Sequence, residues 1–418
     1  MNKSCATAAA LGAFLCLGSA AWAQGTCTFA NLADAVASGT YEDEDLLWEC
    51  SHTFDLSSDN NWGDRLFNIA VRETANPRIV LILSELGAPL GASYVALDIA
   101  LRHNPHTDIV AVLMALGEES ILDTWQIRPE HRYFAPRLTG EEFRPRFPSA
   151  DANVDCSEFL TPRFMAKTSP GQIRHCQARA HPRARDGSEN TALHLAAQYS
   201  EDPSAIDAII AGIPAGGRPA FIDARNREGQ TALHVAARHA RNADIVTALL
   251  AHGADPNALA REDRVGILRQ RRGIAPLHRA VRHDDPARAF QITARLLAYG
   301  ADMEIRTPEE EEEEGGRMAL HLAAHGARTD DVLWLLLQAE QSTAGITEGW
   351  GEHWLDRRRN DAKQTALHFL TQTSNTPWVF GLALDYGLSP DAQDDDDWYP
   401  PDVLCRAWHR CGNHALAS

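Results

Sequence analysis

One heptapeptide pattern recurs five times in this chain of 418 residues and constrains its fold more than any other feature. It reads Thr-Ala-Leu-His-Leu-Ala-Ala at residues 191–197 and returns, with substitutions, at 231–237, 275–280, 318–324 and 365–370. The histidines of successive copies are spaced by 40 to 47 residues. An internal repeat of this length is typical of a solenoid, in which each unit buries its apolar face only against its neighbours.

Each position of the pattern has a physical role at the start of a helix. The hydroxyl of Thr191 can cap the first free N–H groups, and the next position suits proline, which the third copy has as Pro276. Leu193 is expected to face the core. Ala196 and Ala197 are small, so a second helix and the next unit can approach closely.

A second helix is expected after each copy. Residues 245–250 are apolar at helical spacing, and Gly253 then supplies a left-handed residue that ends a helix. Residues 295–302 follow the third copy and read in the same way.

The Thr-x-Leu-His-x-Ala-Ala cores and the Leu-Leu-x-x-Gly-Ala-Asp-x-Asn segment resemble the ankyrin repeat family over residues 187–392. The resemblance implies an all-α solenoid of stacked helix-turn-helix repeats with short β-turn fingers, capped at both ends. Ankyrin units have roughly 33 residues. The longer steps in this chain therefore imply insertions, in the fingers and in the loops between the two helices of a unit.

The first 23 residues are predicted to be a signal peptide. Lys3 gives a positive start, residues 6–21 are apolar or small, and Ala21-Trp22-Ala23 is a cleavage motif. The mature chain would begin at Gln24, be periplasmic or secreted, and have no membrane insertion after cleavage. A membrane anchor, or a lipoprotein attached through Cys16, are the alternatives.

The remaining segments flank the five clear repeats of residues 187–392. We expect an N-terminal cap at 24–60, two degenerate ankyrin repeats at 61–117 and a C-terminal cap at 393–418. Asn68 and Asp98 stand where the later repeats have histidine. Residues 118–186, rich in proline, arginine and aromatics, are expected to be an irregular insert that packs on the solenoid, either as a recognition element or as a structural bridge.

Six cysteines remain after the signal peptide and fall into three local couples. The expected disulfides are Cys27 with Cys50, Cys156 with Cys176, and Cys405 with Cys411, although six cysteines allow 15 pairings. An oxidising compartment permits such crosslinks. No couple has the close spacing of a zinc site, so no metal is expected.

Composition limits the kinds of partner that the chain can bind. A formal net charge of −18 argues against nucleic acid, which needs a basic face. An apolar fraction of 44% rules out wholesale disorder. The acidic run Glu309 to Glu314 lacks the alternating ligands and turn glycine of a calcium loop and is expected to be solvated.

We find no nucleophile elbow, zinc-protease motif or phosphate-binding loop, so neither catalysis nor a cofactor is predicted. The repeated histidines lie one unit apart and are expected to bond backbone and threonine within their own turn rather than a metal. The alternative is an enzyme whose active site lies in the 118–186 insert. A pocket gathering His131, His175 or His181 with acidic groups would favour that alternative.

The predicted function is therefore that of a protein-protein interaction scaffold in the cell envelope. The resemblance implies binding of a partner protein on the concave face, through finger tips and first helices; a cell-envelope structural or protective protein is a further alternative. Carried over by position, the candidate residues are Arg227, Glu228, Gln230, Arg238, His239, Gln198, Tyr199, Lys363 and Gln364. Trp350 and Trp354, in another insert, are candidate aromatic anchors.

Overall fold

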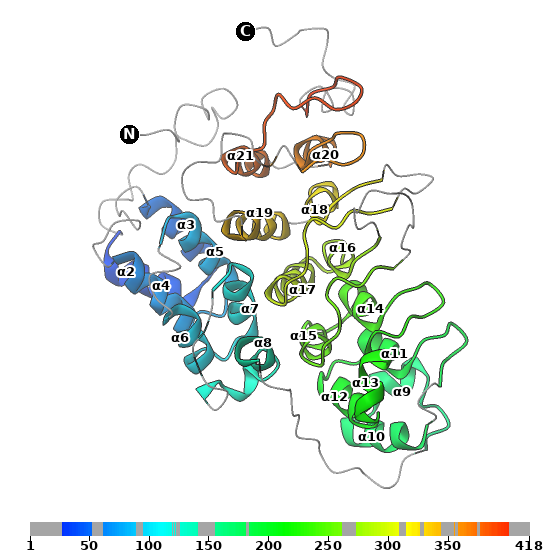
Figure 1. The fold of residues 1–418 in the computed structure, drawn as a ribbon. Helices are drawn as coiled ribbons and strands as arrows, with labels where there is room; N and C mark the ends of the chain where they lie inside the picture. The colour runs from blue at the N-terminus through cyan, green and yellow to red at the C-terminus, as the bar shows by residue number, and fades with distance from the viewer. Residues whose placement is uncertain are drawn as a thin grey trace. The chain divides into compact units, whose positions relative to one another are not determined.

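The computed structural model of the chain is helical (Figure 1). It describes residues 27–51, 62–88, 95–118, 120, 122, 126–140, 155–180, 184–260, 273–308, 315–326, 330–343, 355, 358–373 and 377–400. Within these ranges, extended pairing amounts to one isolated bridge between Ala260 and Ile274. The predicted all-α repeat solenoid is confirmed.

The chain divides into two compact units, Met1–Ile109 and Val110–Ser418. The first unit contains α2 (Phe29–Ser38), α3 (Tyr41–Cys50), α4 (Trp62–Glu73), α5 (Pro77–Glu85) and α6 (Val95–His103), and α7 (Thr107–Ala115) crosses its boundary. α2 packs against α4, and α4 packs against α6. The first helices of successive pairs therefore form one row in this unit.

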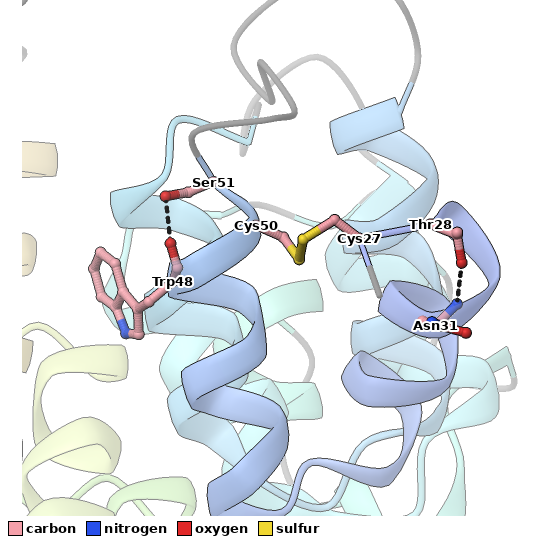
Figure 2. The surroundings of a disulfide bond; sticks show 6 residues. All are labelled: Cys27, Thr28, Asn31, Trp48, Cys50 and Ser51. Carbon is pink, nitrogen blue, oxygen red and sulfur yellow. Dashed lines mark hydrogen bonds between the residues drawn. A yellow bond between two sulfur atoms is a disulfide. The ribbon is translucent and has the colours of Figure 1, made fainter. Parts of the chain in front are cut away.

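The first helix pair shows why the N-terminal segment folds as it does. The Thr28 hydroxyl caps α2 by accepting the Asn31 N–H at 3.3 Å, and Gly39 ends the helix at a φ of 63°. The disulfide between Cys27 and Cys50 joins the start of α2 to the end of α3 (Figure 2). This cysteine pair is as predicted from the sequence.

The second unit is built from helix pairs in two parallel rows. The first helices are α9 (Pro162–Lys167), α11 (Ala192–Tyr199), α14 (Ala232–His239), α16 (Pro276–Ala280), α18 (Ala319–Gly326) and α20 (Ala366–Thr373). The second helices are α10 (Pro170–Arg179), α12 (Ser204–Ala211), α15 (Asp244–Ala251), α17 (Pro286–Ala298), α19 (Asp331–Thr343) and α21 (Pro377–Asp385). From α9 to α20 each first helix packs against the next, and from α10 to α19 each second helix does the same.

Small residues make this stacking possible. The paired alanines of the pattern, such as Ala196, Ala197, Ala236 and Ala237, have no exposed surface. One insertion adds η4 (Ala215–Gly217) and α13 (Arg218–Ile222) after α12, in the connection that leads to the next repeat. Insertions therefore lengthen the connection between repeats without breaking the helical rows.

The expectation of an irregular insert over residues 118–186 is wrong for its second part. α9 and α10 form one more helix pair, which packs against α11 and α12 at the start of the stack. Thr161 caps α9 by accepting the Phe164 N–H at 3.3 Å, and Pro162 is its first residue, as in the Thr-Pro start of a repeat. The pair escaped the sequence pattern because Phe164 stands where the other repeats have histidine. The Cys156–Cys176 disulfide, expected from the sequence, crosslinks this pair.

The first part of that segment, with η3 (Pro129–His131) and α8 (Ala135–Thr139), packs on the second helices of the stack. The Tyr133 hydroxyl donates to Asp207 on α12 at 2.9 Å, and His252, just after α15, lies 2.8 Å from the other carboxylate oxygen. The ring centroids of Phe134 and Tyr299 are 6.2 Å apart. Tyr133 and Phe134 thus join the segment to the repeats of α12 and α17, and α8 packs on α15 of the repeat between them.

Among the helices of the described ranges, no single one is both long and apolar enough to cross a membrane. The bent pair Ser204–Ala211 and Ala215–Ile222 passes such a test by length and composition alone.

Candidate protein-binding face

The connections that precede the first helices form tight fingers organised by an Asp or Asn side chain. Its carboxylate or amide oxygen accepts N–H groups two or four residues further along the chain, at 2.7–3.0 Å. Such side-chain turns fix a loop without a regular hydrogen-bonded ladder. The residues concerned are Asp186, Asn226, Asn360 and Asp394.

Arginines tie each finger to its neighbour. Arg185 donates to the Arg225 carbonyl at 2.6 Å, and Arg225 donates to the Leu259 carbonyl at 2.5 Å. Further along the stack, Arg359 donates to the Gln393 carbonyl at 3.0 Å. The planar guanidinium, with five donors, suits this bridging of backbone carbonyls better than a lysine would. We call the fingers linked in this way, residues 185–190, 225–230, 358–364 and 393–398, the finger row.

Sequence reasoning missed these arginines, although they have a signal. Arg185, Arg225 and Arg359 each lie nine residues before the histidine of their repeat, and Arg269 occupies the same position in the third copy. Arg269 lies outside the described residues. The high arginine content of the chain thus has a structural use in the fingers.

The repeated histidines join each helix start to the next finger. The Nδ1 atom of His234 accepts the Thr231 N–H at 3.2 Å, so the proton of a neutral ring sits on Nε2, which donates to the Ile274 carbonyl at 2.8 Å. His194, His278, His321 and His368 repeat this arrangement, with Nε2 to carbonyl distances of 2.9–3.3 Å. The expected bond within the histidine's own turn is therefore present, and a second bond to the next repeat accompanies it.

Burial keeps these rings neutral. It lowers the pKa of His234 and of His278 to about 4, and the pKa of His321 to about 3, despite the carbonyl that each ring contacts. Among the described residues, no group of three His, Cys, Asp or Glu side chains is placed to hold a metal ion.

One strained position in the finger row gives a direct stability prediction. Glu189 has a φ of 62°, a left-handed conformation that the equivalent Gly229 adopts with a φ of 73°. Glu189→Gly is expected to raise the free energy of unfolding by about 0.5–1 kcal/mol, because glycine has no Cβ penalty there. Urea unfolding monitored by circular dichroism measures the change. Ser188→Gly, at a neighbouring position without positive φ, serves as the control and should not stabilise; equal gains in both variants would contradict the explanation.

The structure places the candidate finger residues at or near the finger tips. Arg227 and Glu228 are exposed, and the Arg227 N–H donates to the Ser188 carbonyl of the preceding finger at 3.1 Å. Lys363 is exposed and lies 2.5 Å from Asp395 of the next finger. The side chains of Gln230 and Gln364 are half-buried. The candidates Trp350 and Trp354, like Cys405 and Cys411, lie outside the described residues.

The other candidates lie at the far ends of the first helices. We define the turn row as residues 198–202, 238–243 and 281–285, where the first helices end and turn into the second ones. Gln198, Tyr199 and Arg238 are half-buried there, and His239 is exposed. An eight-residue helix such as α14 is about 12 Å long, so the finger row and the turn row form two separate strips.

The turn row contains an open hollow of about 700 Å³. Its lining comes from three successive repeats, from two turns and from helix α17: Glu201, Arg241, Asn242, Ala243, Arg288 and Gln291. The Asn242 amide donates to the Glu201 carbonyl at 2.9 Å, and Arg288 Nε donates to the Arg241 carbonyl at 2.9 Å. These bonds between repeats fix the walls of the hollow.

In the segment considered for an active site, the described residues around Tyr133 pack on the repeats. Its Tyr133 and Arg132 contact the acidic group Asp207, at 2.9 and 3.4 Å. His131 is buried on η3 and His175 is half-buried on α10, while His181 lies outside the described residues. Burial, followed by the nearby Asp207 charge, raises the pKa of Tyr133, so this phenol stays protonated. The contacts here fasten the segment to α12.

Comparisons with known proteins bear on this architecture. Residues 165–260 match the family model of ankyrin repeats, in three copies, and this range begins within α9. A search of curated proteins gives no match. Among solved structures, the ankyrin repeat domain of Bcl-3 is similar, with 20% identity, a TM-score of 0.41, and coverage of 60% of this chain and 94% of that one.

A second similar structure is that of the Bd0816 predatory endopeptidase from Bdellovibrio bacteriovorus in complex with immunity protein Bd3460. The similar chain in it has 19% identity and a TM-score of 0.39, and the alignment covers 54% of this chain and 95% of that one.

Proposed function

We propose that this chain, an ankyrin-repeat protein, is a non-enzymatic scaffold that binds a partner protein along its repeats in the cell envelope. Ankyrin repeats are protein-protein interaction modules, and the family match covers the repeats that carry the fingers 185–190 and 225–230. The identity of the partner is left to experiment.

The observation that carries the proposal is the hydrogen bonding between neighbouring fingers of the finger row. Its backbones are linked from finger to finger, through Arg185 and Arg225 at 2.6 and 2.5 Å and through the Arg227 N–H at 3.1 Å. A surface that is already rigid loses little conformational entropy when a partner docks. The exposed charged tips Arg227, Glu228 and Lys363 would then supply specificity rather than rigidity.

The location in the envelope rests on two features. The Cys27–Cys50 and Cys156–Cys176 disulfides are compatible with a periplasmic or extracellular location, where such bonds persist. The first 23 residues, outside the described part of the chain, have the composition of a secretory signal. Cleavage after Ala23 would deliver the repeats to that compartment.

A charge swap at one fingertip tests both parts of the proposal. The full chain with its leader is expressed in a bacterial host with a C-terminal tag, crosslinked in intact cells, and analysed by quantitative mass spectrometry. The variant Arg227→Glu/Glu228→Arg keeps the net charge and the fold, and we expect it to reduce the crosslinked partner about tenfold or more, as for a hot-spot contact.

Arg179→Glu is the matched control, because Arg179 is an exposed arginine on the second helix α10, away from the fingers. It should leave the crosslinked partner unchanged. N-terminal sequencing of the recovered protein should give Gln24. Equal partner yields from the fingertip variant and the wild type would refute the binding face, and an uncleaved leader would refute the proposed export.

A further inference from the structure

The middle of the repeat stack differs in charge from the rest of the chain. Residues 225–306 contain 14 arginines and nine aspartates and glutamates, so they are net basic in a chain with a net charge of −18. Five of these arginines and two of the acidic residues belong to 261–272, outside the described residues, and the described remainder has nine arginines and seven acidic residues. An acidic partner is therefore attracted to this part more than to the flanking segments. The charge pattern thus favours one location for an acidic ligand.

Five of the six residues that line the hollow in the turn row belong to this basic part, and the sixth is Glu201. Arg241 and Arg288 line it from successive repeats, and their side chains are 55% and 39% exposed. Arg288 is held in a fixed orientation by the Arg241 carbonyl at 2.9 Å and by Asp285 at 2.5 Å. Its guanidinium is therefore presented to the hollow without further ordering.

The acidic group that faces Arg241 is weakly bound. Glu201 lies 3.6 Å from the Arg241 guanidinium, and its own side chain is 72% exposed. An exposed pair at this distance adds little stability. A carboxylate that approaches Arg241 in a bidentate geometry would therefore displace Glu201 at small cost.

We infer that the turn-row hollow binds an acidic, extended segment of a partner protein, with carboxylates that engage Arg241 and Arg288. This inference rests on the proposed scaffold function and adds the chemistry of the partner. Helices of adjacent repeats pack about 8–10 Å apart, and an extended chain advances about 3.3 Å per residue. Acidic residues at every third position would thus match successive turns.

A protein segment suits this hollow better than a polyphosphate or a lipid surface. Glu201 and Asp285 stand among the arginines, and Asp284 is bonded to Arg238 at 2.9 Å. A continuous line of phosphates would meet these carboxylates as well as the arginines. A segment with separated acidic residues can place its carboxylates between them.

The test uses the full mature chain and a labelled peptide, (Glu-Ala-Ser)4, with (Gln-Ala-Ser)4 as the neutral match, in fluorescence anisotropy. We expect the acidic peptide to bind and the neutral one not to bind, and binding should weaken as salt is raised. Arg241→Ala should weaken binding about tenfold, the scale of one charged hydrogen-bonded pair. Arg179→Ala, an exposed arginine on α10, should leave binding unchanged.

Several results would overturn the inference. These are equal binding of both peptides, no binding of the acidic one, a larger effect from Arg179→Ala than from Arg241→Ala, or displacement of the peptide by phosphatidylserine vesicles. If the peptide fails to bind while the fingertip swap still abolishes partner crosslinking, the scaffold function stands and the acidic segment is excluded. If Arg241→Ala weakens both peptide binding and partner crosslinking, the scaffold function and the acidic segment are both supported.

Discussion

Replacement of Arg295 with alanine is expected to lower the free energy of unfolding of the repeat stack by about 3–5 kcal/mol. Arg295 lies on α17 with a side chain that is 2% exposed, and it contacts Asp244 at 2.8 Å and Thr247 at 2.9 Å on α15. The substitution would leave the Asp244 carboxylate without its cation, the buried Thr247 hydroxyl without this partner, and a cavity between two repeats.

The effect should be large because each repeat depends on its neighbours. The matched control is Arg288→Ala on the same helix, where the pair with Asp285 has exposed fractions of 39% and 37%. Removal of this ion pair is expected to lower the free energy of unfolding by less than about 1 kcal/mol. Urea unfolding of both variants, followed by circular dichroism and by intrinsic fluorescence, gives the two free energies of unfolding. Similar losses in both variants would show that burial of Arg295 does not determine its contribution.

The repeated Thr-x-Leu-His-x-Ala-Ala pattern predicts the repeats because each of its residues acts locally. Thr231 is the N-cap residue of α14 with its hydroxyl 2.9 Å from Nδ1 of His234, the alanines allow the neighbouring helix to approach, and Nδ1 of His234 accepts the Thr231 N–H. Such roles leave the same residue types at the same spacing in every copy. The fold class and the five clear repeats could therefore be predicted.

The parts that were missed depend on contacts between distant residues. Arg295 belongs to an apolar helix and reads as a surface residue, yet its partner is 51 residues away in α15. Tyr133 reads as part of an irregular insert, yet it bonds Asp207, which is 74 residues away. The helix pair α9 and α10 was missed for a different reason, because Phe164 replaces the histidine that defines the pattern. Local sequence rules do not identify partners that are 51 or 74 residues apart, as those of Arg295 and Tyr133 are.

The candidate binding residues could be placed by position but not ranked. The sequence assigns Glu228 to a finger tip and Arg238 to the outer face of a first helix, and it ranks neither above the other. In the structure, Arg238 bridges to Asp284 of the next repeat at 2.9 Å, whereas Glu228 is exposed at a fingertip. Which of two surface residues is engaged by a neighbouring repeat depends on how the repeats stack, which the pattern alone does not specify.

Lowering the pH from 7 to 5 is expected to destabilise the stack through its buried histidines. Burial lowers the pKa of His234 and His278 to about 4 and of His321 to about 3, while an unfolded histidine has a pKa of about 6.5. Above pH 6.5 neither state binds the protons, and the full stability is present. Below pH 6.5 the histidines of the unfolded chain bind protons, whereas the buried rings of the folded chain do not. The free energy of unfolding therefore falls until the pH reaches the pKa of the ring in the folded chain.

Between pH 7 and pH 5 each such ring lowers the free energy of unfolding by about 2 kcal/mol, since one pKa unit corresponds to about 1.4 kcal/mol. Nearby cations also lower the pKa of these rings. They are Arg279 beside His278, and Arg306 and Arg317 beside His321. Glu118 acts in the opposite direction: burial raises its pKa to about 7, so its protonation over the same range favours the folded state. The wild-type curve is therefore a sum of opposing contributions.

The variant His278→Asn isolates one ring from this sum. The difference in unfolding free energy between pH 7 and pH 5 should be about 2 kcal/mol smaller in the variant than in the wild type. Ring nitrogen NMR provides a second measurement that does not depend on stability. The Nδ1 atom of His278 accepts the Ala275 N–H at 3.0 Å, so its ring should show the Nε2–H tautomer and no titration between pH 7 and pH 5. A His278 ring that titrates in this range would mean that protons enter the folded stack, and the proposed cause of acid destabilisation would be wrong.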